Sequence, residues 1–450
     1  MEQSSDFYGS EKISKILLKI APPVMLAQLI QALYNVVDSL FVGKYAESGL
    51  TALSIIYPIQ LLMIALAVGT GVGINTCMTY FAGLGKKEKS KETAGMSMPL
   101  GLLLWVLFAG ICFFFMPAYA KMSTDSEKVI EEVIVYGRIV CVCSIGLFLE
   151  SNWTKVLQAN GDMKTPMIAQ IIGALTNIVL DPILIFGLFG VPCMGIAGAA
   201  IATVIGQIAA ALIVMPKGFV KPPARQKFAE HTKKIYAMGI PNILMQSAYT
   251  VYIFGLNMIL AGFSDQAVTA LGLYYKWQSF FFIPLGALQT CIVPIVSFNY
   301  AANRIDRCKQ TMAAALKSGF ALMMIGVLCF ELIPSQMLSF FTTDRTVIEI
   351  GTHGFHIIGI SFIPMVTSLT FPVFFQAVGS AKKSSLLTIV RTVVLFVPLG
   401  FLFSRIGLYW FWLTFPITEI LTSLLGVYFY RQFIKRKLLA KTEKIVIDSQ

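Results

Sequence analysis

Charged residues are scarce in this chain of 450 residues. Asp, Glu, Lys and Arg together make up 13% of it, against 56% hydrophobic residues. Soluble domains carry about 25% charged residues, and the mean hydropathy of +0.75 lies far on the apolar side. The composition therefore excludes a soluble globular protein and indicates a polytopic membrane protein of the all-α class.

Motifs of catalysis and metal binding are also missing. The chain has three histidines and eight cysteines, with no CxxC pair and no metal-ligand spacing. Cys141 and Cys143 would point to different sides of a helix, so we expect the cysteines to fill the core. The sequence has no phosphate-binding glycine loop and no nucleophile constellation. We therefore expect that the protein is not an enzyme and has no cofactor. We also expect an ion gradient to supply the energy for its activity.

Apolar runs of about 20 residues, long enough to cross roughly 30 Å of hydrocarbon, recur along the chain. They predict twelve transmembrane helices, at residues 14–42, 51–81, 94–116, 129–157, 166–189, 193–215, 234–262, 267–300, 311–334, 346–375, 384–404 and 408–430. The first run lacks a small-residue cleavage site after a short apolar core. We therefore expect a retained helix there and not a signal peptide.

Basic residues are distributed unevenly between the loops of this chain, whose net charge is +12. Alternate loops and both tails hold nearly all of them, and the opposite loops hold Lys44, Lys121, Lys128, Arg345 and Arg405. Because basic residues favour the cytoplasmic side, we predict a multi-pass protein of the cell membrane with both termini cytoplasmic. The basic excess is then a topology signal, which argues against a nucleic-acid partner.

An internal repeat relates the two halves of the chain at a shift of 218 residues. The shift aligns Pro23 with Pro241, Gln28 with Gln246, Thr51-Ala52-Leu53 with Thr269-Ala270-Leu271, Tyr57 with Tyr275, Gln158-Ala159 with Gln376-Ala377, Gly161 with Gly379, and Lys164 with Lys382. Two six-helix lobes follow, related by a pseudo-two-fold axis along the membrane normal. The predicted order is a cytoplasmic tail (1–13), the first lobe (14–216), a basic cytoplasmic linker (217–233), the second lobe (234–430) and a basic cytoplasmic tail (431–450).

The first apolar run carries a polar face. At about 100° per residue, Gln28, Gln31, Tyr34, Asn35 and Asp38 fall within one sector of about 120°. A carboxylate at the centre of a membrane helix costs about 3 kcal/mol to insert. We therefore expect Asp38 to face a bundle interior or an aqueous cavity.

A second polar set lies in the fifth and sixth runs. Asn177 and Asp181 are four residues apart and share a helical face, and Pro182 frees a backbone carbonyl beside them. Thr203 lies in a run whose small residues permit close helix contact. Residue counting puts Asp38, Asp181 and Thr203 in the outer half of the membrane, where they can form one cluster. The cluster is either an ion-coupling site or a satisfied hydrogen-bond network.

The repeat supplies an internal comparison for this set. At the shift of 218 residues, Asp38 falls on Leu256, Asn177 on Leu395, Asp181 on Leu399, Thr203 on Leu421 and Tyr34 on Tyr252. Polar residues kept in one half only favour a functional role, whereas the tyrosine kept in both favours packing. Other polar residues in the runs are candidates to line a cavity, namely Gln28, Gln31, Asn35, Glu150, Gln246, Lys276 and Glu419.

Four stretches resemble the multidrug and toxic compound extrusion (MATE) family. They are Tyr34 to Gly43 (YNVVDSLFVG), Gln158 to Lys164 (QANGDMK), Asn177 to Pro182 (NIVLDP) and Gly195 to Thr203 (GIAGAAIAT). The similarity covers nearly the whole chain. It implies twelve helices in two lobes, a V-shaped central cleft, and export of cationic amphiphilic compounds driven by protons or sodium ions.

The resemblance also implies a coupling site. In the DinF-type branch, the coupling positions match Tyr34, Asp38, Asn177, Asp181 and Thr203, and a sodium ion would be held by Asp38, Asn177 and Asp181. The NorM-type branch adds acids in the seventh and tenth helices, whereas here the seventh run has none and the tenth has only Glu349, in its first turn. Expected partners are small cationic amphiphiles and the lipid bilayer, with the protein a monomer. Alternatives are a flippase of lipids or lipid-linked oligosaccharides in the same superfamily, and a channel, receptor or membrane enzyme.

Overall fold

The computed structural model describes residues 7–448, without the side chains of residues 47, 50 and 438–448, and that part of the chain contains no strand. Its first helices are α2 (Ile13–Tyr45), α3 (Glu47–Gly83), α4 (Lys87–Gly95), α5 (Ser97–Ser123), α6 (Glu127–Val142), α7 (Ile145–Ala159), α8 (Lys164–Phe186), η1 (Leu188–Gly190), α9 (Gly195–Gly218) and η2 (Arg225–Lys227). They are followed by α10 (Phe228–Ala261), α11 (Asp265–Ala301), α12 (Ile305–Leu332), α13 (Pro334–Ser339), α14 (Arg345–Ala377), α15 (Ala381–Ile389), η3 (Val390–Phe396), α16 (Val397–Ser404), α17 (Leu408–Phe411) and α18 (Thr414–Asp448).

The number of membrane-crossing helices agrees with the prediction. Among the described residues, eleven helices are long and apolar enough to cross a membrane, and one bent pair raises the number to twelve. That pair is α6 and α7, which meet at an angle of 41°. The all-helical class is therefore confirmed, but the fourth predicted helix, at 129–157, is bent and not a single rod.

Proline and glycine set several of the helix ends. Pro334 stands at the start of α13, where its missing N–H has no intrahelical partner to lose. The α8 helix continues through Pro182 and ends at Gly187, whose φ of 74° lies in the left-handed region that glycine adopts at little cost. The site residues on α8 therefore lie on one unbroken helix.

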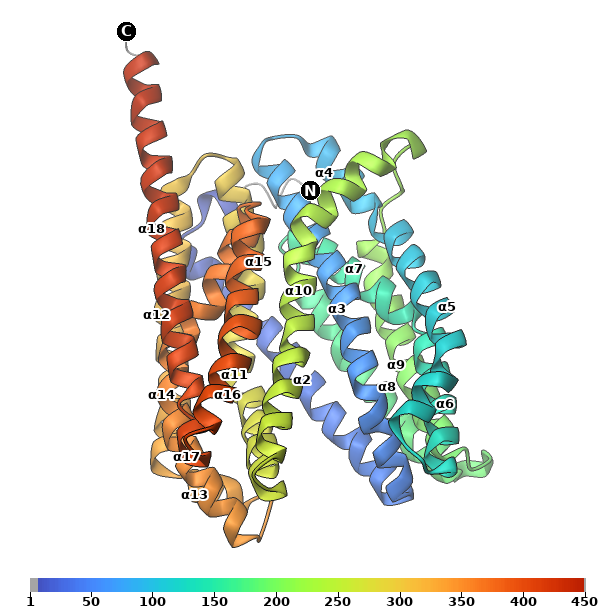
Figure 1. The fold of residues 1–450 in the computed structure, drawn as a ribbon. Coiled ribbons are helices and arrows are strands. Elements are labelled where there is room, and N and C mark those ends of the chain that lie inside the picture. The colour runs from blue at the N-terminus through green and yellow to red at the C-terminus, as the bar shows by residue number, and fades with distance from the viewer. Residues whose placement is uncertain (1–6, 449–450) are drawn as a thin grey trace. The chain divides into compact units, whose positions relative to one another are not determined.

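The chain divides into two compact units (Figure 1). The first unit comprises Met1–Glu11 with Leu18–Gln246, and the second comprises Lys12–Leu17 with Ser247–Gln450. The boundary between them falls inside α10. Each unit is a bundle of helices with a core of its own.

The two cores differ in composition. The core of the first unit is built largely from aliphatic side chains, among them the fully buried Ile56 and Val133. The second is rich in aromatic rings, and Phe330 and Phe355 stack there with ring centroids 4.6 Å apart. Cys141 is buried as expected, but Cys143 is exposed, as is Cys193, so core packing does not account for every cysteine.

Glycines bring α8 and α9 into close contact in the first unit. A Cβ atom on Gly206 would lie 2.7 Å from the carbonyl oxygen of Gly173, and one on Gly198 would lie 2.6 Å from the carbonyl oxygen of Leu184. No side chain larger than hydrogen fits at these contacts without a shift of the backbone. The small residues of the sixth run therefore permit the close contact that the sequence predicts.

A polar cluster ties α4 to the beginning of α10 within the first unit. Glu92 of α4 accepts hydrogen bonds from Lys227 and from Nε2 of His231, the latter at 3.2 Å. Nδ1 of the buried His231 lies 3.2 Å from Oγ1 of Thr93. These contacts hold α4, the short helix that follows the second membrane crossing, against the beginning of α10.

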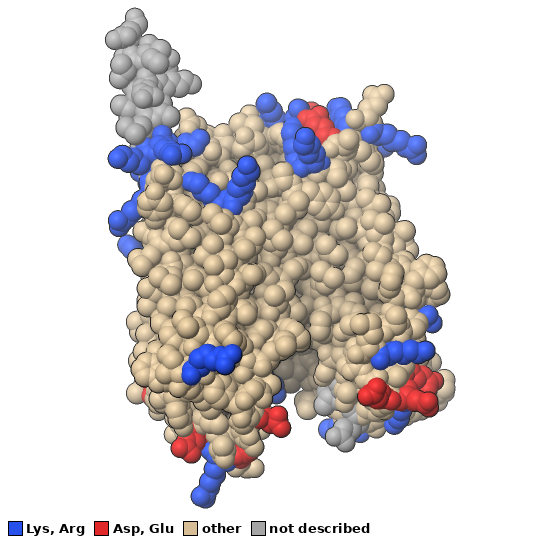
Figure 2. Space-filling view, in the orientation of Figure 1, with Lys and Arg blue, Asp and Glu red and all other residues tan. Residues whose placement is uncertain are grey.

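Basic residues gather mainly at one end of each unit (Figure 2). In the first unit that end holds α4 and the beginning of α10, and in the second it holds the beginning of α15 and the part of α18 past residue 430. This distribution agrees with the charge asymmetry between alternate loops. The cytoplasmic location of that end stays a prediction.

Candidate functional site

The polar face of α2 is only partly buried. Asp38 is 8% exposed and therefore buried. Gln28 and Tyr34 are half-buried, whereas Gln31 and Asn35 are exposed. The face predicted from the sequence thus turns its carboxylate into the first unit and leaves two of its amides accessible.

The neighbouring groups come from α8 and α9. Asn177 and Asp181 are almost completely buried, at 2% and 0% exposure. Nδ2 of Asn177 donates to Oδ1 of Asp181 at 3.3 Å and approaches Oγ1 of Thr203 at 3.4 Å. The amide therefore bridges the two helices across their glycine contact.

The carboxyl groups of Asp38 and Asp181 interact directly, and Tyr34 lies within electrostatic range of both. In the described part of the chain, neither carboxyl group has a basic partner. Two carboxylates that share one dry site repel each other, and each loses its hydration. The pair therefore favours a state in which a proton or another cation cancels part of the charge. We call Asp38, Asn177, Asp181 and Thr203 the acid cluster.

Three buried oxygens of the acid cluster have no hydrogen-bond partner in the part of the chain that the structure describes. They are Oδ1 of Asp38, Oδ1 of Asn177 and Oδ2 of Asp181. An unpartnered buried polar atom costs about 1–3 kcal/mol. Oxygens from two carboxylates and one amide suit a hard cation, which takes several oxygen ligands, and a carboxylate oxygen also suits a proton.

Two residues near the acid cluster were missed by sequence reasoning. Tyr136 of α6 is 2% exposed and interacts with Thr203, and it also lies within electrostatic range of Asp38. Gln60 of α3 approaches the hydroxyl of Tyr136 at 3.4 Å. An isolated tyrosine in an apolar run gives no periodic signal, so no pattern in the sequence pointed to this contact.

The residues proposed to line a cavity differ in their surroundings. Gln246 is half-buried and donates to Oδ1 of Asn242 at 2.8 Å. Lys276 is exposed, with its ammonium 5.0 Å from the ring centroid of Phe341. Glu150 is buried and belongs to a separate polar group with Thr154 and Gln170.

Glu419 corrects one of these expectations. It is completely buried and forms an ion pair with Arg391, with NH2 of Arg391 and Oε1 of Glu419 2.6 Å apart. Ser368 donates to the same carboxylate. In this structure Glu419 therefore neutralises a buried guanidinium, which argues against the predicted cavity-lining role.

The repeat register also needs a correction beyond the early helices. The stretch η3 is a π-helical turn between α15 and α16, and such a turn inserts one extra residue into a helix. Asn177 and Asp181 are buried. Phe396 and Gly400, each one position beyond the predicted equivalent, are buried as well. The leucines predicted there, Leu395 and Leu399, are only half-buried.

The same shift of one residue applies to α18. Thr203 is buried, and its equivalent becomes the fully buried Thr422, whereas Leu421 is 44% exposed. Asp38 keeps its predicted equivalent, the fully buried Leu256. The threonine is thus present in both halves, while the two carboxylates are present in the first half only.

A contact inside the second unit supports the corrected register. A Cβ atom on Gly400 would lie 2.8 Å from Cδ2 of Leu256, so the leucine packs directly against the glycine. In the first unit the equivalent pair is Asp38 and Asp181, whose side chains also meet. The second unit therefore fills with a leucine the space that two acids occupy in the first.

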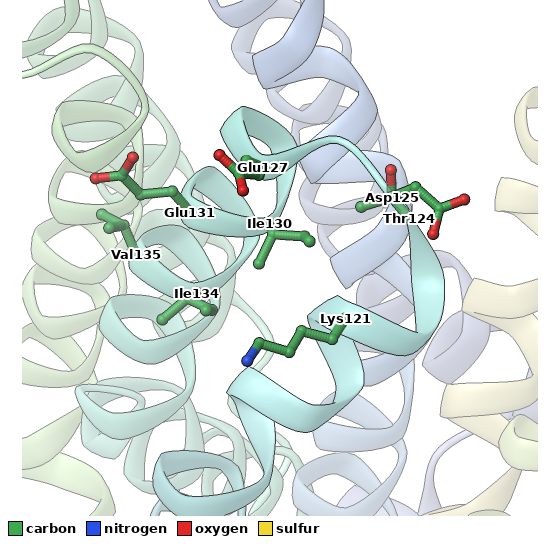
Figure 3. Close-up of a pocket in the computed structure, with 8 residues that line it drawn as sticks. All are labelled: Lys121, Thr124, Asp125, Glu127, Ile130, Glu131, Ile134 and Val135. Carbon is green, nitrogen blue, oxygen red and sulfur yellow. The ribbon is translucent and has the colours of Figure 1, made fainter.

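A hollow of about 490 Å³ lies elsewhere in the first unit, between the end of α5 and the start of α6 (Figure 3). Lys121 reaches from α5 towards Ile134 of α6, while Glu131 points away from the hollow. The hollow contains no residue of the acid cluster, and we assign it no function.

The MatE family model matches the chain twice, over residues 23–183 and 241–402. The chain belongs to the MatE family. The first residues of the two matches, 23 and 241, are 218 positions apart, which equals the repeat shift of this MatE protein. The last residues, 183 and 402, are 219 positions apart, which agrees with one extra residue in η3.

Relatives of this MatE chain include named transporters. It is 25% identical to the probable multidrug resistance protein YoeA of Bacillus subtilis over 92% of both chains. It is 24% identical to the multidrug export protein MepA of Staphylococcus aureus, over 94% of this chain and 96% of that one. It is also 24% identical to a FAD transporter of Shewanella oneidensis, over 93% of this chain and 94% of that one.

Solved structures share the fold. One is an outward-facing conformation of a multidrug resistance MATE family transporter, with a TM-score of 0.90 and 22% identity over 97% of this chain and 98% of that one. Another, a MOP superfamily transporter from Pyrococcus furiosus, has a TM-score of 0.89 and 22% identity over the same shares. The family match and the named relatives identify the MatE protein as a membrane transport protein and not an enzyme.

Proposed function

We propose that this protein exports small cationic amphiphilic compounds across the cell membrane by antiport with protons or sodium ions. The acid cluster, with Tyr34 beside it, is the proposed coupling site. The observation that carries this proposal is the direct contact of two buried acids, Asp38 and Asp181, without a basic partner in the described part of the chain. A pair of this kind needs a cation from outside the chain.

The proposed cycle begins in an outward-facing state. An external proton or sodium ion enters the acid cluster and is held by Asp38, Asp181 and Asn177, with Thr203 in support. Neutralisation removes the demand of Asp38 for water, so α2 can change its shape and release the substrate outward. The ion drives this change only because it binds the two states unequally.

The names of relatives support export of drugs and also widen the range of substrates. Two of them are named for multidrug resistance or export, and a third is named a FAD transporter, whose substrate is anionic. We favour cations because the resemblance to the MATE family implies cationic amphiphilic substrates. Uptake of a cationic dye and of FAD by the same vesicles would separate the two substrate classes.

The coupling ion and the site can be tested together in proteoliposomes. Ethidium transport is measured with a pH gradient or a sodium gradient imposed separately, for the wild type and for Asp38→Asn and Asp181→Asn. We expect one gradient to drive transport in the wild type and neither gradient to drive it in the two variants. Leu256→Ala is the matched control in the second repeat, and it should lose stability but keep its gradient dependence.

Two outcomes would contradict the proposal. If both Asn variants fold and respond to the gradient as the wild type does, the acid cluster is structural only. If neither gradient drives a cation in the wild type while a lipid-linked sugar is moved across the bilayer, the protein is a flippase.

A further inference from the structure

Glu150 is a second buried acid in the first unit that the proposed cycle does not use. It lies on α7, is 7% exposed, and accepts hydrogen bonds from Oγ1 of Thr154 at 2.8 Å and from Nε2 of Gln170 on α8 at 3.0 Å. Both bonds go to the same oxygen, Oε1. Acids within membrane helices are costly and therefore point to ion pathways.

The α8 helix connects Glu150 to the acid cluster. Gln170, Asn177 and Asp181 lie at i, i+7 and i+11, which puts them on one helical face. At 1.5 Å per residue, Gln170 lies about 10 Å from Asn177 along the helix axis. Gln170 lies toward the Lys164 end of α8, which the charge asymmetry assigns to the cytoplasm.

The α9 helix adds a polar group between the two ends. Gln207 follows Thr203 by four residues and so shares its face, and its Oε1 is buried without a hydrogen-bond partner. Gly146 precedes Glu150 by one turn of α7, and a Cβ atom on it would lie 2.8 Å from the carbonyl carbon of Gln207. Helices α7, α8 and α9 therefore place polar groups in one row between Glu150 and Asp181. The groups between these two acids are the amides of Gln170, Gln207 and Asn177.

The groups that face Glu150 are mostly neutral. Gln170 faces it from α8, and the groups that bond to its helix from α3 and α5 include the neutral Asn75 and Ser97. The charged group that acts on it is Lys155 of its own helix, whose ammonium donates to Oε1 of Gln158 at 2.9 Å. A carboxyl group in these surroundings can exist with or without its proton, since no ion pair among the described residues fixes its charge.

We propose that Glu150 is a proton-binding station on the cytoplasmic side of the acid cluster, which takes up the proton that enters at Asp38 and Asp181 and releases it to the cytoplasm. An O–H bond on the Asp38 and Asp181 pair breaks, and one forms on the carboxylate of Glu150. Gln170 and Asp181 lie 11 residues apart, about 16 Å along α8, which exceeds one hydrogen bond. Transfer therefore requires α8 and α9 to separate at the contact of Gly173 with Gly206 and admit water. This inference rests on the proposed antiport and makes the proton the coupling ion.

The test compares net proton movement with substrate exchange in proteoliposomes that contain a pH-sensitive dye. For Glu150→Gln we expect ethidium-driven proton flux to fall at least tenfold, with exchange of ethidium for ethidium at equal pH within about twofold of the wild type. The amide retains the acceptor oxygen for Thr154 and Gln170, so folding should be preserved. Glu150→Asp restores a carboxyl group and should recover part of the proton flux.

Glu331→Gln is the control, because Glu331 is a half-exposed acid of the second unit paired with His356, and it should leave both rates unchanged. Equal loss of flux and exchange in Glu150→Gln, with no recovery in Glu150→Asp, would assign a structural role and overturn the inference. Ethidium-driven proton flux at the wild-type rate in Glu150→Gln would also overturn the inference. A wild type that moves no protons with ethidium would instead contradict proton coupling at the acid cluster itself.

Discussion

At the scale of single residues, the acid cluster depends on one amide. Asn177 donates to Asp181 and approaches Thr203, and its own Oδ1 remains unpartnered. A neutral hydrogen bond contributes about 1 kcal/mol, so Thr203→Val should lower the melting temperature slightly and keep gradient-driven transport within about tenfold of the wild type. Asn177→Leu removes both bonds and one ion ligand, and should lower that transport more than tenfold. Equal effects of the two variants in ethidium transport would contradict this ranking.

At the scale of helices, the contact between α8 and α9 holds the cluster together. Gly206→Ala forces a methyl group to within 2.7 Å of the carbonyl oxygen of Gly173, and such overpacking costs about 1–3 kcal/mol. We expect a lower melting temperature and slower gradient-driven transport. Gly110→Ala on α5 is the matched control, because a Cβ atom there meets no described atom within 4 Å outside its own turn of helix and alanine favours a helix over glycine. The prediction fails if the two variants melt alike.

Sequence patterns predicted these helices better than their irregularities. Runs of apolar residues and the i, i+4 spacing of Asn177 and Asp181 were enough to predict α8 and the residues that meet on it. The π-helical turn η3 was not predictable, because one inserted residue leaves the apolar pattern of a buried helix almost unchanged. The bend between α6 and α7 was missed for a similar reason, since the run stays apolar through it.

At the scale of the whole molecule, the charge asymmetry predicts which ends of the helices are cytoplasmic. In a background with Cys143→Ser and Cys193→Ser, which removes both exposed native thiols, Lys87→Cys at the start of α4 should resist a membrane-impermeant maleimide in intact cells. Lys128→Cys on α6 should be labelled. Both positions are exposed, so access to the reagent depends on the side of the membrane alone. Labelling in the reverse pattern would invert the orientation and the direction of the proposed cycle.

The packing of Leu256 against Gly400 bears on the energetics of transport. With leucine and glycine in the second unit where the first has two acids, the proposed cycle has one coupling site and not a symmetric pair. If that site carries one proton per monovalent cation, the exchange moves no net charge and the membrane potential adds nothing to the driving force. Each pH unit is worth 1.36 kcal/mol, so it can sustain a substrate gradient of no more than about tenfold. The stoichiometry of this exporter would then set a low thermodynamic ceiling on accumulation.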